Sequence, residues 1–425
     1  MQLMIKDMLV QNAISSEEKR QQMWMELIAS ENYQSKEVLE VQSSVFANKY
    51  SEGFPWRRYY WWQDNTDIVE SLAIERAKEI FNSDHANVQA LSWAAANLCF
   101  YTAVMNPWDT ILWMDLSHGW HLTHWAPVTF FSKVFNFQRY KTKSDWSIDF
   151  DQLSKLAEEY RPKVILAWFS AYPRELDYSK FVEIWNKVWA ILYADLSHIG
   201  WFIAAGELKN PFDYWFHAMM TTTHKSLRWP RGALILSKWI VSNPLKKPED
   251  TIENLPTRID RAVFPWMQGW PHMNTIAWIT VALWEAQTPE FKKYAHQTLI
   301  NAKVLAEEML HYWYKLVTWW TDNHMIVMDF SWENYNWADV EKTLDKIWIS
   351  TSKSTIPDDP NPPFKPSGLR IWMQAMTTRW VKEDDTKKIA SFIHNAIQNQ
   401  NDEGVLNNLH EQVQEFCSAF PIPSI

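Results

Sequence analysis

Short apolar runs of strand length alternate with helical segments along most of this 425-residue chain. The expected strands are Asn87–Ala90, Thr110–Met114, Val164–Ala167, Ile191–Ala194, Ala218–Thr221 and Ala233–Leu236. Amphipathic periodicity predicts helices around them, for example over 66–81, 150–160 and 178–188. A strand–helix alternation of this kind predicts an α/β fold with a mostly parallel sheet and helices on both faces.

The two ends of the chain differ from this central region. Helices are expected over 17–29 and 36–48, and the helix over 66–81 should bury Ile68, Leu72, Ala73 and Ile80. A helix-rich stretch near 272–316 precedes a mixture of short strands and helices. We therefore expect three parts. These are an N-terminal helical arm with dimer contacts (1–60), a large cofactor-binding α/β domain (61–285), and a linking helix with a smaller C-terminal α+β domain (286–425).

Charge and cysteine content exclude several classes of protein. With 41 Lys and Arg against 50 Asp and Glu, the net charge is −9. No positive surplus is present to replace the counterions of nucleic-acid phosphates. The two cysteines, Cys99 and Cys417, are too few for a disulfide framework and are expected to be buried thiols. No apolar run approaches the ~18 residues that span a bilayer, and no signal-peptide pattern is present. A cytoplasmic protein without nucleic-acid or membrane partners is expected.

Two charged residues follow expected strands. Asp195 closes the apolar run ILYAD, and Lys225 comes shortly after the strand that ends near Thr221. Ligands of open α/β sheets bind at the carboxyl ends of strands. A lysine and a carboxylate there suit pyridoxal phosphate, which needs a Schiff-base lysine and an acid facing its ring nitrogen. A buried ion pair explains the same two residues equally well.

Three histidines, His118, His121 and His124, recur at three-residue intervals. Zinc sites use histidine, but no carboxylate or cysteine completes the usual ligand set here. An imidazole that stacks on an aromatic ring is the favoured interpretation, and no metal is expected.

Several segments resemble serine hydroxymethyltransferases, which are pyridoxal-phosphate enzymes of fold type I. The segments include ELIASEN (26–32), NKYSEGFPWRRYYWW (48–62), HANVQALSW (85–93), MDLSHGWHLTHW (114–125), ADLSHI (194–199), TTTHKSLRWPRG (221–232) and SGLRI (367–371). They occur in the family's order from about residue 20 to residue 400. The resemblance implies a seven-stranded-type sheet and a homodimer, or a tetramer, whose sites are shared between subunits.

The resemblance also implies roles for individual residues. Lys225 would bond to pyridoxal 5'-phosphate, Asp195 would pair with its ring nitrogen, and His121 would stack on the ring. Further cofactor contacts would come from Ser92, Trp93, Ala94, Ser170, His198, His224 and, in the neighbouring subunit, Gly269. Ser30, Tyr50, Glu52, Tyr59, Tyr60 and Arg370 would bind substrate, with Arg370 on its carboxylate. Glu52 would transfer protons and Tyr60 would assist. Leu116, Leu122 and Ser354 would contact tetrahydrofolate.

The chain departs from this family in one respect, because it has 29 Trp and only 8 Gly. Tryptophan stands at places that favour glycine, such as Pro107-Trp108-Asp109, where a turn is expected. Trp93 falls where backbone N–H groups should approach the cofactor phosphate, and Trp61, Trp62 and Trp270 fall near the same site. We interpret most of these tryptophans as replacements of glycine, which predicts poor folding or low activity.

The expected reaction is the reversible transfer of the serine hydroxymethyl group to tetrahydrofolate, which belongs to one-carbon metabolism. Two alternatives remain. One is a folate-independent β-hydroxy-amino-acid aldolase of the same fold, against which the segment with Glu52, Tyr59 and Tyr60 argues. The other is a non-catalytic engineered variant of the fold, which the tryptophan at the phosphate cup favours.

Overall fold

The computed structural model describes residues 5–115, 130–168, 170–228, 231–239, 252–331, 337–362 and 365–424. The chain divides into two compact units. The sheet unit is Gln34–His296, and the terminal unit combines Met1–Tyr33 with Gln297–Ile425. The predicted boundaries of the three parts stay predictions.

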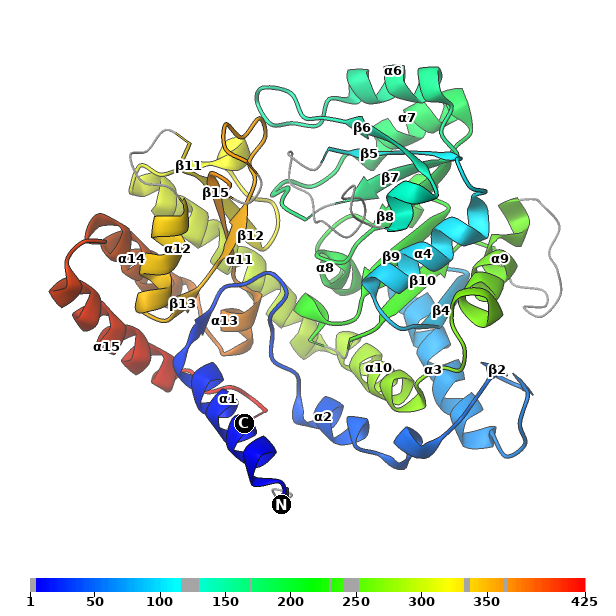
Figure 1. The fold of residues 1–425 in the computed structure, drawn as a ribbon, viewed down its shortest axis with the longest axis horizontal. Helices are drawn as coiled ribbons and strands as arrows, with labels where there is room; N and C mark the ends of the chain where they lie inside the picture. Colours follow the sequence, from blue (N-terminus) through cyan, green and yellow to red (C-terminus); the bar gives the residue numbers. More distant parts are fainter. Residues whose placement is uncertain are drawn as a thin grey trace. The chain divides into compact units, whose positions relative to one another are not determined.

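The sheet unit is built on a sheet that has seven strands among the described residues, in the order β4-β10-β9-β8-β7-β5-β6 (Figure 1). The strands are β4 (His85–Ala90), β5 (Thr110–Met114), β6 (Asn136–Tyr140), β7 (Val164–Trp168), β8 (Ile191–Asp195), β9 (Ala218–Thr222) and β10 (Ala233–Ser237). Neighbours from β6 to β9 pair in parallel, and β10 is antiparallel to both β9 and β4. The predicted α/β class with a mostly parallel seven-stranded sheet is confirmed.

Helices connect these strands and flank the sheet. They are α2 (Lys36–Gln42), α3 (Asp64–Phe81), α4 (Trp93–Val104), α6 (Phe150–Tyr160), α7 (Tyr178–Val188), α8 (Gly200–Ala205), α9 (Leu255–Arg261) and α10 (Met273–Ala286). Side-chain caps fix where several of them begin. Ser92 caps α4 by accepting from the Ala95 N–H, and Asp149 caps α6 by accepting from the Gln152 N–H. A short hairpin of β2 (Gly53–Phe54) and β3 (Arg57–Arg58) precedes α3.

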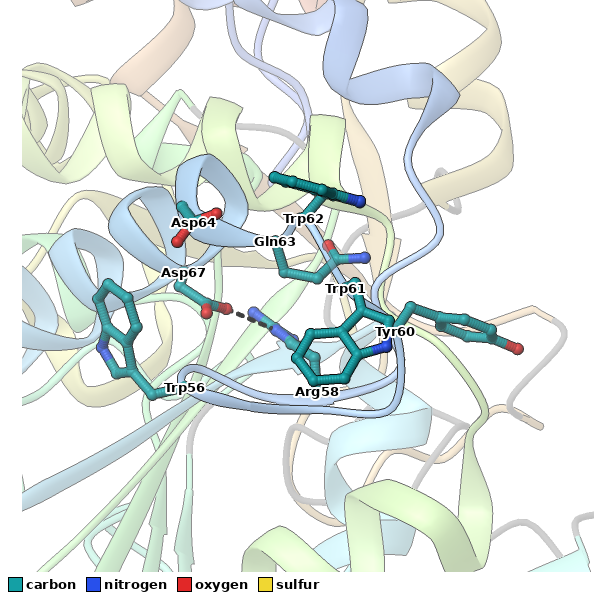
Figure 2. Close-up of a pocket in the computed structure, with 8 residues that line it drawn as sticks. All are labelled: Trp56, Arg58, Tyr60, Trp61, Trp62, Gln63, Asp64 and Asp67. Atoms are coloured by element: carbon teal, nitrogen blue, oxygen red, sulfur yellow. Dashed lines mark hydrogen bonds and ion pairs between the residues drawn. The ribbon is translucent and has the colours of Figure 1, made fainter.

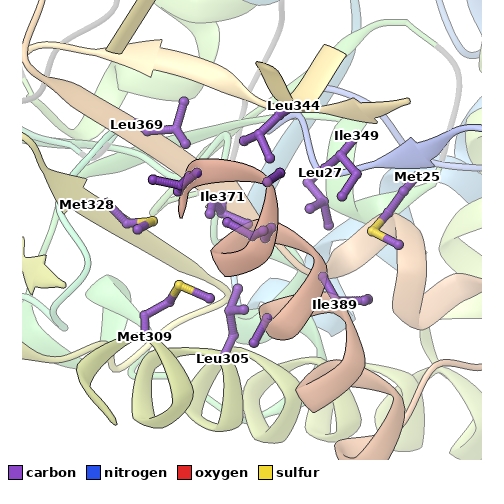
Figure 3. Close-up of a cluster of buried hydrophobic side chains, with 14 of the residues drawn as sticks. Met25, Leu27, Leu305, Met309, Met328, Leu344, Ile349, Leu369, Ile371 and Ile389 are labelled. Atoms are coloured by element: carbon purple, nitrogen blue, oxygen red, sulfur yellow. The ribbon is translucent and has the colours of Figure 1, made fainter. Parts of the chain in front are cut away.

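The terminal unit contains a four-stranded antiparallel sheet, in the order β11-β12-β15-β14. Its strands are β11 (Lys315–Leu316), β12 (Met325–Asp329), β14 (Ser352–Ser354) and β15 (Gly368–Trp372), and β1 (Met25–Glu26) pairs separately with β13 (Ile349–Ser350). Its helices are α1 (Met8–Met23), α12 (Trp337–Lys346), α13 (Gln374–Thr378), α14 (Glu383–Gln398) and α15 (Glu403–Ala419), while α11 (Pro289–His311) begins in the sheet unit. Figure 3 shows side chains of β1, β12, β15, α11 and α14 gathered in its hydrophobic core.

Two expectations about helices are wrong. The helix expected over 17–29 ends at Met23, because Met25 and Glu26 pair with Ile349 and Ser350 as a strand. In α3, Ala73 is buried as expected, but Ile68 and Leu72 are exposed. The buried face instead holds Asp67 and Glu70, which are both ion-paired with Arg58. Among the helices that the structure describes, none has the length and apolar character needed to cross a membrane.

Candidate active site

The predicted cofactor residues follow strands that run in the same direction. Ser170 comes after β7, Asp195 ends β8, and Lys225 comes after β9. These strands are parallel neighbours, so their carboxyl ends lie at one edge of the sheet. Strand β10 is antiparallel to both β9 and β4, so β4 runs in the same direction as β9. The carboxyl end of β4 and the start of α4 therefore lie at this edge as well. The topology therefore brings Ser92, Ser170, Asp195 and Lys225 to one place.

Asp195 is 1% exposed and is held by four hydrogen-bond donors. Its Oδ1 accepts from the backbone N–H of Ser197 at 3.0 Å and from the Ser197 hydroxyl at 2.6 Å. Its Oδ2 accepts from the Trp93 indole Nε1 at 2.5 Å and from the Asn97 amide at 3.3 Å. The Tyr193 hydroxyl donates to the Asn97 Oδ1 at 2.8 Å and so orients that amide. Hydrogen bonds to a charged acceptor are strong, so this carboxylate has a fixed position.

Lys225, His198 and Ser170 form a row of three neighbouring polar side chains. Lys225 is 8% exposed, and its Nζ lies 3.3 Å from the His198 Nε2. The same His198 nitrogen lies 3.4 Å from the Ser170 hydroxyl oxygen. The φ angle of Lys225 is 71°, in the left-handed region that residues with a side chain rarely adopt. Strain of this kind costs about 1–3 kcal/mol and clusters at functional sites.

The Trp93 indole lies between the carboxylate and the amine. It is 8% exposed, its Nε1 donates to Asp195, and the Lys225 Nζ lies 4.9 Å from the centroid of its ring. The sequence placed this residue at the cofactor phosphate. The structure instead directs its side chain to the groups expected to hold the cofactor ring.

The polar groups at this edge fit pyridoxal phosphate. The cofactor needs a lysine for its aldehyde and an acid for its ring nitrogen, and Lys225 and Asp195 supply both. It also needs an anion site for its phosphate, and the first turn of α4, at exposed Ser92 and half-buried Ala94, is of the type that binds anions. The space between these groups is a poorer fit, because the Trp93 ring lies in it.

Two other predicted cofactor residues border this edge. Burial, together with the charges of Lys225 and Arg231, lowers the pKa of His224 to about 3, so His224 is neutral at physiological pH. Gly269 is exposed, and a Cβ atom built on it would meet no atom within 4 Å. Its surface is therefore open, as an approach to a neighbouring subunit would require.

The predicted substrate tyrosines gather beside the β2–β3 hairpin. The Tyr50 ring lies 4.4 Å from the Trp270 ring and 5.9 Å from that of Tyr60, and Tyr59 packs edge-on against Phe264. Desolvation and the nearby Glu52 carboxylate raise the pKa of Tyr50. Glu52 is half-buried, and its carbonyl accepts from the Tyr59 N–H. The structure joins these four residues to one another; their approach to Lys225 stays a prediction.

A hollow of about 590 Å³ lies at the same hairpin (Figure 2). Its lining residues are Trp56, Arg58, Tyr60, Trp61, Trp62, Gln63, Asp64 and Asp67. Of the predicted site residues, this lining includes only Tyr60. Trp61 and Trp62, expected near the cofactor site, are 89% and 88% exposed.

The remaining predicted residues belong to the terminal unit or lie outside the described ranges. Ser30 is exposed, Arg370 occupies the middle of β15, and buried Ser354 ends β14 and donates its hydroxyl to the Thr355 carbonyl. Burial lowers the pKa of Arg370 to about 10. The residues Leu116, His121 and Leu122 lie outside the described residues. Among those that are described, no group of three or more His, Cys, Asp or Glu could hold a metal.

Sequence reasoning missed two residues that position Asp195. Asn97 lies one turn after Trp93 in α4, and Ser197 lies two residues after the carboxylate. An amide in the largely apolar helix WAAANLCFYTAV was a signal for Asn97, because buried polar groups need partners. Nothing in the sequence indicated that the Trp93 ring contacts Asp195, because sequence alone does not give the direction of a side chain at the start of a helix.

Comparison with known proteins gives two matches that cover nearly the whole chain. A family model described as serine hydroxymethyltransferase matches residues 3–393. A curated serine hydroxymethyltransferase of Halorhodospira halophila is 41% identical over 410 residues, which are 96% of this chain and 95% of that protein.

Proposed function

Because the chain belongs to the serine hydroxymethyltransferase family, we propose that its active site lies around Asp195 and Lys225 at the carboxyl edge of the seven-stranded sheet. The chain is a pyridoxal-phosphate-dependent transferase that interconverts serine and glycine, with tetrahydrofolate as co-substrate. One observation carries the location of the site. A buried carboxylate and a buried amine follow neighbouring parallel strands.

Each polar residue at this edge has a task toward the cofactor. Bound pyridoxal phosphate withdraws electrons from the α-carbon of the amino acid. Asp195, fixed by Ser197 and Asn97, would accept a hydrogen bond from the ring nitrogen of the cofactor. Lys225 supplies the amine, and His198, 3.3 Å from that amine, holds or accepts its proton. His121 would cover the ring face, as the resemblance to the family implies.

The substrate requires a cation for its carboxylate and a base for its hydroxyl group. We assign Arg370 to the carboxylate, because a guanidinium with a pKa of about 10 stays charged at neutral pH and binds in a bidentate manner. Glu52 holds the proton of the hydroxymethyl oxygen, with Tyr60 beside it. Tyr50, Tyr59 and Ser30 complete the substrate contacts. We assign the tetrahydrofolate ring to Leu116, Leu122 and Ser354.

A homodimer is the proposed assembly, with Gly269 of each subunit serving the site of the other. The open surface at Gly269 supports it, as do Trp266 and Trp270 beside it, which are 60% and 46% exposed. Light scattering during gel filtration should give twice the chain mass or more, and a monomer at micromolar concentration would contradict the proposal.

We also propose a cytoplasmic location, which the free buried thiols of Cys99 and Cys417 support. Cell fractionation tests it.

The test of the function is the conversion of labelled serine to glycine with tetrahydrofolate and added pyridoxal phosphate. It should be run on the chain and on a Trp93→Gly variant, which removes the indole beside Asp195. Lys225→Ala in either background should abolish conversion, because it removes the amine that is proposed to bond to the cofactor. Full conversion by Lys225→Ala would contradict the assignment of this lysine. Conversion of equal rate without tetrahydrofolate would favour the aldolase alternative.

A further inference from the structure

Trp93 has a position that the proposed function does not explain, because its ring lies among the groups that should bind the cofactor. Resting on that function, we propose that the Trp93 indole occupies the place of the pyridoxal ring and competes with the cofactor for Asp195 and Lys225. Trp93 is then an internal occluding residue that sets how readily the cofactor binds.

The hydrogen bond to Asp195 is the first argument. An indole N–H and a protonated pyridine N–H are both flat-ring donors, and both suit a carboxylate acceptor. The Trp93 Nε1 donates to the Asp195 Oδ2 at 2.5 Å. The Oδ1 of the same carboxylate accepts two hydrogen bonds from Ser197, one from its backbone N–H and one from its hydroxyl. The oxygen that the cofactor would need therefore already has a charge-assisted hydrogen bond to Trp93.

The contact with Lys225 is the second argument. The Lys225 Nζ lies 4.9 Å from the centroid of the Trp93 ring, within the range of a cation–π interaction. Such a contact favours the ammonium form of the lysine. The amine attacks an aldehyde only when neutral, so the indole opposes cofactor bonding at this end as well.

The backbone at Trp93 leaves the indole few alternatives. Trp93 is the first residue of α4, directly after the capping Ser92, and its carbonyl accepts from the Asn97 amide at 3.3 Å. With its backbone held in the helix, the ring leaves only by rotation of its side chain. That rotation breaks the bond to Asp195 and removes the ring from its present buried position, in which Trp93 is 8% exposed. Binding of the cofactor must supply this free energy, which weakens its apparent affinity.

The test compares the chain with Trp93→Gly and Trp93→Ala. Trp284→Gly, which removes a half-exposed tryptophan from α10, is the matched control. Each protein is titrated with pyridoxal phosphate and treated with borohydride. The Lys225 nitrogen bonds to the aldehyde carbon, water leaves, and borohydride supplies the hydride that reduces the C=N bond to a stable amine. Mass spectrometry of the Lys225 peptide then measures bound cofactor without any assay of activity.

We expect half-labelling of Lys225 at about 100-fold lower cofactor concentration in both Trp93 variants, which corresponds to about 2.7 kcal/mol. Trp284→Gly should label like the parent chain. Equal labelling of the parent and of both Trp93 variants would overturn the occlusion while leaving the role of Lys225 intact.

A second measurement does not use the cofactor. Reductive methylation with formaldehyde should modify Lys225 faster in both Trp93 variants than in the parent, relative to the surface residue Lys187, whose side chain is 52% exposed. An unchanged ratio in folded variants would overturn the occlusion. An increased ratio without any pyridoxal phosphate adduct on Lys225 would support the occlusion and contradict the proposed cofactor role of Lys225.

Discussion

At the scale of single residues, Glu26 shows how burial changes the chemistry of a side chain. It lies in the short strand β1 and is 7% exposed, and its carboxylate accepts from the Ile28 N–H. Burial raises the pKa of Glu26 from its usual value to about 7, although the hydrogen bond from Ile28 opposes this. The side chain therefore gains a proton close to physiological pH.

Glu26→Gln should stabilise the chain only at higher pH. Between about pH 4.5 and 7 the folded state binds a proton that the unfolded state has released. The free energy of unfolding therefore falls as pH rises through this window, by about 3 kcal/mol in total.

Urea unfolding should show Glu26→Gln more stable than the parent by about this amount at pH 8, and equal to it at pH 4. Exposed Glu411→Gln is the control and should show no such divergence. Parallel pH profiles for Glu26→Gln and the parent would contradict the raised pKa.

Trp313 shows a different residue-scale effect, in the backbone. It follows α11, has a φ of 67° and is 93% exposed. Its N–H donates to the Leu310 carbonyl, and the Tyr314 N–H donates to the Met309 carbonyl. This pair of bonds is the Schellman motif, in which the left-handed residue is usually glycine.

Trp313→Gly should therefore raise the free energy of unfolding. Relief of left-handed strain gains about 1–2 kcal/mol, and the more flexible unfolded chain takes back about 0.4–1 kcal/mol. The expected net gain is about 0.5–1 kcal/mol, measurable as a higher urea midpoint. Trp284→Gly, inside α10, should instead lower the midpoint, since glycine is the poorer helix former. A shift of the same sign in both variants would count against the backbone explanation.

At the scale of elements, the ion pairs of Arg58 fix the hairpin to α3. The Arg58 side chain is 2% exposed and lies 2.8 Å from Asp67, a contact that Figure 2 shows. It also lies 2.6 Å from Glu70, and its Nη1 donates to the Ser51 and Gly53 carbonyls. Burial raises the pKa of Glu70, although Arg58 acts against this. This network explains why α3 buries two acids and leaves Ile68 exposed.

Arg58→Met should destabilise the chain strongly. It leaves two buried carboxylates without their cation, which typically costs about 3–5 kcal/mol. Thermal unfolding followed by circular dichroism should show the loss. The control is Lys187→Met, which breaks an exposed pair with Glu158 and should change stability by less than about 1 kcal/mol. Equal effects of the two substitutions would show that the Arg58 network contributes little.

Sequence predicted six of the seven strands that the structure describes in the central sheet, because most of them are continuous apolar runs between turns. It also singled out Asp195 and Lys225, because a charged residue at or shortly after the end of such a run is unusual; their roles toward the cofactor stay predictions. It did not predict the buried face of α3, where ion pairs to Arg58 outweigh apolar periodicity. Nor did it predict β1, whose two residues become a strand only by pairing with β13, nor β6, whose sequence NFQRY alternates only weakly.

At the scale of the whole molecule, tryptophan is concentrated where the backbone is left-handed. Of the 17 non-glycine residues with positive φ in the described ranges, 11 are tryptophan. Glycine adopts this region at no steric cost, whereas other residues are strained there. This supports the interpretation that tryptophan stands in places that suit glycine, which stays a prediction. At about 0.5–1 kcal/mol each, eleven such positions together approach the 5–15 kcal/mol that stabilises a typical protein.

Replacing several of these tryptophans by glycine should therefore stabilise the molecule cumulatively. Suitable positions are Trp108, Trp189, Trp215, Trp313 and Trp380, all of them at least 68% exposed and none of them assigned to the active site. Distant sites add, so the five changes together should gain about 3–5 kcal/mol and raise the Tm by about 4 °C. Scanning calorimetry on the combined variant measures this.

The matched control replaces the same five tryptophans by alanine. Alanine removes the exposed indoles, which favour association, but retains a Cβ atom in the left-handed backbone. The alanine variant should therefore aggregate less than the parent, yet its Tm should remain below that of the glycine variant. If alanine raised the Tm as much as glycine, the cost of these tryptophans would lie in their exposed rings. If glycine alone raised it, the cost would lie in the backbone that the fold imposes on them.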